Sequence, residues 1–263
     1  MSLQWTIRAK DEKPPLQFLQ GFPLFVISQI VVQTGHFVLL NYYGTFGLVL
    51  YSILLAANMA LDPLASNSLG KNVEILRANG FTDGFVVVAM LVNLVSSQAL
   101  TLIVINWIGG QDGMASLWSS QVYNFQLLGR ILINLGSTEV LFFLAHKFLH
   151  QVWPEIHVMH HCCKHSSWTT NLIFHPIDLA FEFGGPGAIL LLLHYFAWEQ
   201  DKPALLLSYM FVQTYYAIDH DEWTRTYHYE HHAKIDSVYT IYVHKREDAK
   251  LNRVKKLIKS VSN

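Results

Sequence analysis

The sequence predicts an all-α fold, an integral-membrane bundle of about four to six membrane helices with a cytosolic helical cap rich in histidine. Hydrophobic residues make up 52% of the chain and charged residues only 14%, compared with about 25% charged residues in soluble domains. The hydrophobic residues are gathered into long runs instead of being spread along the chain. Eight of the 14 histidines fall into three short clusters, which are expected to form the cap.

Four apolar runs predict the first membrane helices. They are residues 22–40, 45–61, 85–108 and 125–149. Because a spanning helix needs about 20 apolar residues, the first two runs are expected to form a tight spanning hairpin, with Asn41 and Gly44 in its turn. The polar segment 62–84 is expected to be an exposed loop, and the linker 109–121 contains no lysine or arginine.

Two further apolar runs follow the second histidine cluster. Residues 172–198 are interrupted by Gly184-Gly185-Pro186-Gly187, and residues 204–218 form a shorter run. Together they predict either a spanning or a re-entrant hairpin. The chain is thus divided into three regions: the N-terminal membrane helices (1–124), the histidine-bearing region (125–244) and a basic, helix-prone cytosolic tail (245–263).

The distribution of lysine and arginine predicts the orientation of the bundle. Basic residues precede the first run, separate the second from the third, lie among the histidine clusters and fill the tail, whereas the linker 109–121 has none. Cytosolic segments of membrane proteins carry an excess of lysine and arginine. If each apolar run crosses the membrane once, all three histidine clusters fall on the cytosolic side.

The three clusters have the spacing of metal ligands. They read HxxxH at residues 146–150 and HxxHH at residues 157–161 and 228–232, and residues three or four apart share one face of a helix. Eight imidazoles exceed the roughly four ligands of a single zinc ion and could supply most of the ligands of two neighbouring ions. Neutral imidazole suits iron, copper, nickel and zinc. The candidate ligands are His146, His150, His157, His160, His161, His228, His231 and His232.

A carboxylate, Glu139, lies within the fourth apolar run, seven residues before His146. Carboxylates at membrane depth are costly and usually have a function. Two roles remain open for Glu139: a hydrogen bond to a metal-binding imidazole, or the capping of a polar group on a neighbouring helix.

The clusters resemble the histidine boxes of the fatty acid hydroxylase superfamily, a group of integral-membrane di-iron oxygenases that includes sterol desaturases and sphingolipid and fatty acid hydroxylases. The resemblance covers about residues 146–242. Phe174-His175-Pro176-Ile177-Asp178 resembles the His-Pro segment after the second box of sterol desaturases, and residues 161–167 resemble the stretch that follows this box in several members. Asp219-His220-Asp221-Glu222 takes the place of an extra histidine before the last box.

This resemblance implies two further site residues. His220 joins the metal ligands, and His175 is a ligand or a supporting residue. His175, Asp178 and Glu182 share helical spacing and are expected to form a polar strip beside the metals. Residues 236–242 depart from the family pattern after the last box, which leaves the type of substrate open.

The resemblance also implies the chemistry: two iron ions, O₂, and hydroxylation or desaturation of a lipid such as a sterol, a fatty acyl chain or a sphingolipid. No haem or flavin domain is evident in the sequence, so electrons are expected from a separate donor such as cytochrome b5. The expected location is the endoplasmic reticulum membrane, with the metal site facing the cytosol, and no nucleic-acid partner is expected.

Two other classes of protein remain as alternatives. A non-enzymatic membrane metal transporter or sensor would place its ligands along a path within the spans, whereas these clusters are expected at helix ends. A zinc hydrolase would use fewer protein ligands and keep one position open.

Overall fold

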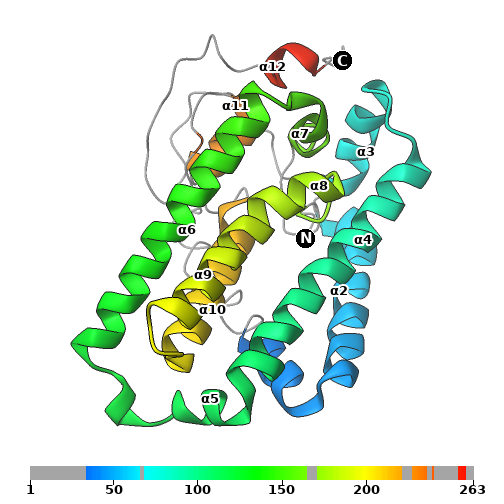
Figure 1. The fold of residues 1–263 in the computed structure, drawn as a ribbon. Coiled ribbons are helices and arrows are strands. Elements are labelled where there is room, and N and C mark those ends of the chain that lie inside the picture. The colour runs from blue at the N-terminus through cyan, green and yellow to red at the C-terminus, as the bar shows by residue number, and fades with distance from the viewer. Residues whose placement is uncertain are drawn as a thin grey trace, which may run out of the picture.

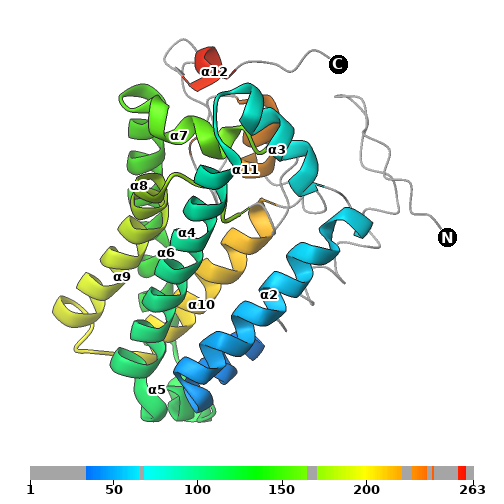
Figure 2. The same cartoon turned by 90° about the vertical axis from the view of Figure 1, so that its right-hand side faces the viewer.

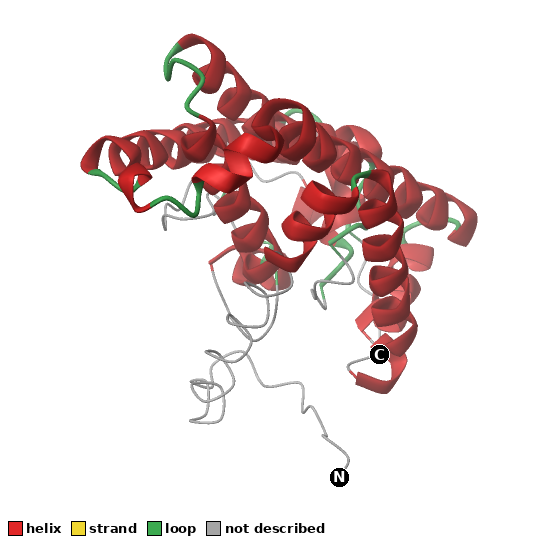
Figure 3. Ribbon diagram, turned by 90° about the horizontal axis from the view of Figure 1, so that it is seen from below, coloured by secondary structure: helices red, strands yellow, loops and turns green. Residues whose placement is uncertain are grey.

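The computed structural model describes residues 34–65, 68–164, 171–220, 227–235, 239 and 254–258, and its secondary structure over these residues is helical without strands (Figures 1 and 3). The predicted all-α fold is therefore confirmed for this part of the chain. Residues 34–43 are helical. The elements that follow are α2 (Thr45–Ala65), α3 (Ser68–Ala78), α4 (Asp83–Leu102), η1 (Ile103–Gly109), α5 (Gly110–Ser116), η2 (Ser120–Val122), α6 (Phe125–Gln151), α7 (Pro154–His161), α8 (Pro176–Leu179), η4 (Ala180–Gly184), α9 (Gly185–Phe196), α10 (Lys202–Asp219), α11 (Tyr227–Lys234) and α12 (Val254–Leu257).

Three helical stretches within the described residues are long and apolar enough to cross a membrane, which indicates a membrane protein. They are Asp83–Asn106, Phe125–Gln151 and Pro176–Phe196. Large apolar side chains are exposed along α4 and α6, among them Val88, Leu91, Val95, Leu132 and Leu144. Such faces suit lipid, because the backbone polar groups of a helix are already hydrogen-bonded within the helix.

A tight turn at Gly44 joins residues 34–43 to α2, as the sequence predicts. Gly44 has a φ of 52°, a left-handed conformation that glycine adopts without steric cost. The two helices approach so closely that a Cβ atom at position 47 would lie 2.2 Å from the carbonyl oxygen of Leu39. The first part of the predicted run, residues 22–33, lies outside the described residues.

The segment 62–84 is not the exposed loop that its polarity predicts, because the end of α2, the whole of α3 and the start of α4 occupy most of it. Asn72 and Leu76 are buried on one side of α3, whereas Arg77 is exposed. Leu76 belongs to an apolar cluster that also contains Met159 of α7. The segment is therefore an amphipathic helix, and its buried stripe docks the second histidine cluster onto the bundle.

The predicted interruption at residues 184–187 is also wrong, since Pro176–Phe196 is one continuous helical stretch. The turn before the proline is a π-helix, in which the N–H of Gly185 donates to the carbonyl oxygen of Ala180, five residues earlier. Pro186 lies in the first turn of α9. Because the hydrogen bonding shifts to the wider π pattern, proline's missing N–H does not end the helix.

Polar contacts fix α6 against α10 near the α5 end of the bundle. Arg130 of α6 forms an ion pair with Asp201, just before α10. Deeper in the interface, the side-chain amide of Asn134 donates to Ser208 Oγ at 2.9 Å and accepts a hydrogen bond from Trp198 Nε1 at 2.7 Å. These contacts set the register between the two helices, and α6 carries the first histidine cluster at its other end.

The histidine-bearing helices gather at one end of the bundle. Figures 1 and 2 show α3, α7, α11 and α12 together at this end and α5 at the opposite end, with α4, α6, α9 and α10 between them. The linker 109–121, which lacks lysine and arginine, therefore lies far from the histidine clusters. The charge pattern predicts this separation between the linker and the histidine clusters.

Candidate metal centre

Helices α6, α7 and α11 bring the three histidine clusters together. The last turns of α6 carry His146 and His150, and His220 directly follows α10. Pro154 begins α7, the helix of the second cluster. The imidazoles that meet are each at most 7% exposed: His146, His150, His157, His160, His161, His220, His228, His231 and His232. Nine of the ten predicted metal ligands are thus assembled in one place.

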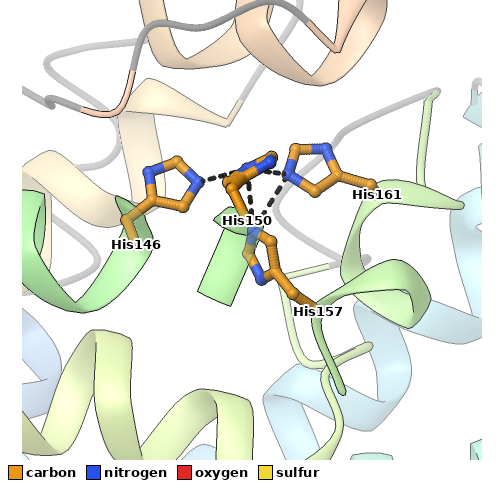
Figure 4. A group of neighbouring side chains, drawn as sticks. All are labelled: His146, His150, His157 and His161. Atoms are coloured by element: carbon orange, nitrogen blue, oxygen red, sulfur yellow. Dashed lines mark hydrogen bonds between the residues drawn. The ribbon is translucent and has the colours of Figure 1, made fainter. Parts of the chain in front are cut away.

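The first group of imidazoles is centred on His150. It comprises His146, His150, His157, His161 and His231. The Nε2 atom of His150 lies 3.1 Å from that of His146, 3.2 Å from that of His157, 3.0 Å from that of His161 and 3.0 Å from that of His231. Figure 4 shows four of these rings converging on a common point.

The second group comprises His160, His220, His228 and His232, whose candidate ligand atoms lie within 4.8 Å of one another. The Nε2 atom of His228 lies 3.0 Å from that of His220 and 3.2 Å from that of His232. The two groups adjoin, because the rings of His161 and His232 stack with their centroids 4.6 Å apart. The arrangement therefore offers two neighbouring groups of candidate metal ligands.

The distances between nitrogen atoms fit shared metal ions. Two nitrogens that each lie about 2.1 Å from one ion, at right angles, are about 3.0 Å apart. The observed separations in both groups, between 2.9 and 3.2 Å, match this value. Without a cation, the lone pairs of several of these nitrogen atoms would face one another across the same short separation. The residues present thus fit bound metal.

The protonation state of the imidazoles also suits a metal. Burial, followed by the charges of neighbouring histidines, lowers the pKa well below 6.5 for His160, His161, His228 and His232. These rings are therefore neutral at pH 7, which is the form that binds metal ions. Both ring nitrogens of His160 are buried without a hydrogen-bond partner among the described residues, so a ligand is needed there.

Carboxylates and a backbone carbonyl orient three of the rings. His157 Nδ1–H donates to Asp178 at 2.9 Å, and His220 Nδ1–H donates to Asp219 at 2.6 Å. His146 Nδ1–H donates to the carbonyl oxygen of residue 239 at 3.3 Å. Each contact fixes the tautomer and leaves Nε2 directed toward the metal groups. Asp219 is adjacent to the predicted ligand His220 in the sequence, but this adjacency alone does not predict the hydrogen bond between them.

The expected polar strip of His175, Asp178 and Glu182 is formed only in part. Asp178 and Glu182 are buried at the imidazoles. His175 does not belong to either group, and its Nδ1 accepts a hydrogen bond from the backbone N–H of Ile177, which caps α8. His175 also lies against Phe85, with ring centroids 5.9 Å apart. His175 therefore caps α8 and is not among the grouped candidate ligands, and its role as a ligand or supporting residue stays a prediction.

Glu139 lies outside the groups of candidate metal ligands. Its side chain is half-buried on α6. The carboxylates that orient the metal-binding imidazoles are instead Asp178 and Asp219. Both roles that the sequence leaves open for Glu139 therefore stay predictions.

Comparison with family models, with curated proteins and with solved structures found no significant match. The resemblance to the fatty acid hydroxylase superfamily therefore stays a prediction. Parts of the segments on which it depends, residues 165–170, 221–226 and 240–242, lie outside the described residues. What the structure establishes is a set of buried histidine clusters that could hold metal.

Proposed function

We propose that this protein is a membrane-bound non-haem di-iron oxygenase that hydroxylates or desaturates a lipid. The observation that carries the proposal is the convergence of nine buried imidazoles in two adjoining groups, at one end of a bundle with three candidate membrane spans. A pair of iron ions, when bound, would supply the redox chemistry that activates O₂ toward an unreactive C–H bond. Hydroxylation consumes one O₂, two electrons and two protons, and it releases one water.

The protein's own residues would hold and shield the ions. Five imidazoles face one site and four face the other, and Asp178 and Asp219 keep His157 and His220 in the tautomer that binds metal. Burial of the whole cluster excludes water, which strengthens electrostatic interactions. So many protein ligands argue against a hydrolytic zinc site, which has about three.

The location of the cluster supports a lipid substrate and an external electron donor. Exposed apolar faces on α4 and α6 indicate contact with acyl chains. The histidines lie at the end of the bundle opposite the linker that lacks basic residues, and this fits a cytosolic location by the positive-inside rule. A donor such as cytochrome b5 could dock there, and the endoplasmic reticulum is the proposed membrane.

The alternative is a membrane protein that binds or transports metal without catalysis. The ligands gather at helix ends and do not follow a path through the candidate spans, which favours the oxygenase. Expression in a host with an oxygenase electron-transfer system, followed by lipid profiling, separates the two proposals. An O₂-dependent hydroxylated or desaturated lipid that is absent with His161→Ala supports the oxygenase, whereas a metal-loaded protein without any such product supports the alternative.

A further inference from the structure

The side chain of Glu182 lies between the two groups of imidazoles. Its Oε1 atom is 3.6 Å from His146 Nε2 and 3.7 Å from His157 Nε2, both in the first group. Its Oε2 atom is 3.9 Å from His160 Nε2, in the second group. Each carboxylate oxygen therefore faces a different candidate metal site.

These distances are those of ligands that share an ion. An oxygen and a nitrogen that each lie about 2.1 Å from one ion are about 3.0 Å apart at right angles and about 4.2 Å apart on opposite sides. The three separations of Glu182 fall within this range. They are too long for hydrogen bonds, so direct contact between Glu182 and the imidazoles does not explain the position of its carboxylate.

One oxygen of this carboxylate also lacks a contact that would stabilise it without a cation. Glu182 is only 4% exposed, and its Oε1 atom has no hydrogen-bond partner among the residues that the structure describes. A buried carboxylate without compensation is costly. Asp178 and Asp219 differ in this respect, because each accepts a hydrogen bond from an imidazole Nδ1–H.

The backbone around Glu182 departs from regular helix. Glu182 lies in the π-helical turn Ala180–Gly184, between α8 and α9. Such turns carry a cost in hydrogen-bond geometry and occur frequently at functional sites. The π turn changes the direction of the residues within it relative to an unbroken α-helix, and here it places the carboxylate between the two groups.

A third cluster of candidate ligands, formed by His157, Asp178 and Glu182, does not require a separate ion. Asp178 accepts the proton of His157 Nδ1, on one side of the ring. Glu182 lies near the Nε2 atom on the other side, which also faces His150 and His161. Asp178 therefore orients the ring, and Glu182 belongs with the two main groups.

We infer that Glu182 is a bridging metal ligand, with Oε1 on the ion of the first group and Oε2 on the ion of the second. Neutral imidazoles leave both ions with their full positive charge, and the bridging carboxylate places negative charge directly between them. This inference rests on the proposed two-metal centre, but it does not depend on the reaction or on the lipid. A bridging role explains three observations: the burial of the carboxylate, its position between the two groups and the π turn that carries it.

The test compares three variants with the wild-type protein after growth on ⁵⁷Fe: Glu182→Gln, Glu182→Asp and the matched control Glu139→Gln. Iron per chain is measured by mass spectrometry, and magnetic coupling and iron–iron separation are measured by Mössbauer and X-ray absorption spectroscopy. We expect two coupled ions in the wild type and in Glu139→Gln. Glu182→Gln should bind the pair at least about 10-fold more weakly and show altered coupling or a longer separation.

Glu182→Asp keeps the charge but shortens the reach by one methylene, so it should also alter the coupling. It serves as the test if Glu182→Gln does not fold, as judged by circular dichroism. Unchanged iron content, coupling and separation in the folded Glu182 variants, beside a normal wild type, would overturn the bridge alone. Fewer than two ions in the wild-type protein would instead overturn the two-metal centre, and the bridge with it.

Discussion

His157 and Asp178 form a buried pair in which the imidazole Nδ1–H donates to the carboxylate at 2.9 and 3.0 Å, while Nε2 of the same ring faces His150 and His161. The carboxylate thus determines which nitrogen is available to a metal. The pair joins the start of the helical stretch Pro176–Phe196 to the second histidine cluster, so it is both a metal-site contact and a tertiary contact.

We expect Asp178→Asn to weaken metal binding about 10- to 100-fold, because an amide no longer fixes the tautomer or raises the basicity of His157. Competition with a chelator of known affinity measures the change. Asp112→Asn, at an exposed position of α5 at the far end of the bundle, is the matched control and should bind metal normally. Equal affinities for the two variants would show that Asp178 has no role in metal binding.

Removal of one ligand from either group should reduce metal binding and abolish turnover. His231→Ala affects the first group and His160→Ala the second, and each should bind metal at least about 10-fold more weakly. His175→Ala is the control, because this ring caps α8 and lies outside both groups. Metal content is measured on protein purified under the same conditions. Full metal content and activity in His160→Ala or His231→Ala would remove the metal-centre account.

Acid should destabilise the metal-free protein. The pKa values of His160, His161, His228 and His232 are lowered by burial, from an ordinary value of 6.5. Below pH 6.5 the unfolded chain therefore binds protons that the folded chain does not, and each such histidine costs up to about 1.4 kcal/mol of stability per pH unit. Stability is complete above this pH and falls as the pH drops from 6.5 toward 5. Thermal unfolding of metal-free protein that is unchanged between pH 7 and pH 5 would contradict the buried, neutral state.

The contacts of Asn134 should affect stability without affecting the metal site. Asn134→Leu leaves the indole N–H of Trp198 and the hydroxyl of Ser208 without this partner, at a cost of about 1–3 kcal/mol for each buried polar group left unpaired. A lower unfolding temperature with normal metal content is the expected result in detergent. Loss of metal in the folded variant would mean that the far end of α6 controls the site.

Much of this fold is visible in the sequence, because membrane helices and histidine spacing depend on local patterns. The run 125–149 predicts α6 to within two residues at its C-terminal end, and HxxHH predicts that three rings of α7 can converge. The structure buries these rings at one end of the bundle but divides them, with His157 and His161 in the first group and His160 in the second. Such features need no knowledge of long-range contacts.

The incorrect predictions concern segments whose structure is determined by tertiary contacts or by irregular backbone. The charged residues of α3 favour the prediction of a loop, but one side of the helix is apolar and packs on Met159. Pro186 favours the prediction of an interrupted helix, because composition does not reveal the π turn that precedes it. For the same reason the position of Glu182 between the two groups could not be foreseen. His175 lies near the site in sequence, but its role as a helix cap depends on where α8 begins.

Anomalous X-ray diffraction from metal-loaded protein tests the central claim most directly, because it locates each ion without reference to activity. We predict two peaks. One should lie about 2.1 Å from Nε2 atoms of the group around His150, and the other at the same distance from those of His160, His220, His228 and His232. A single peak, or peaks remote from these imidazoles, would contradict the two-metal centre.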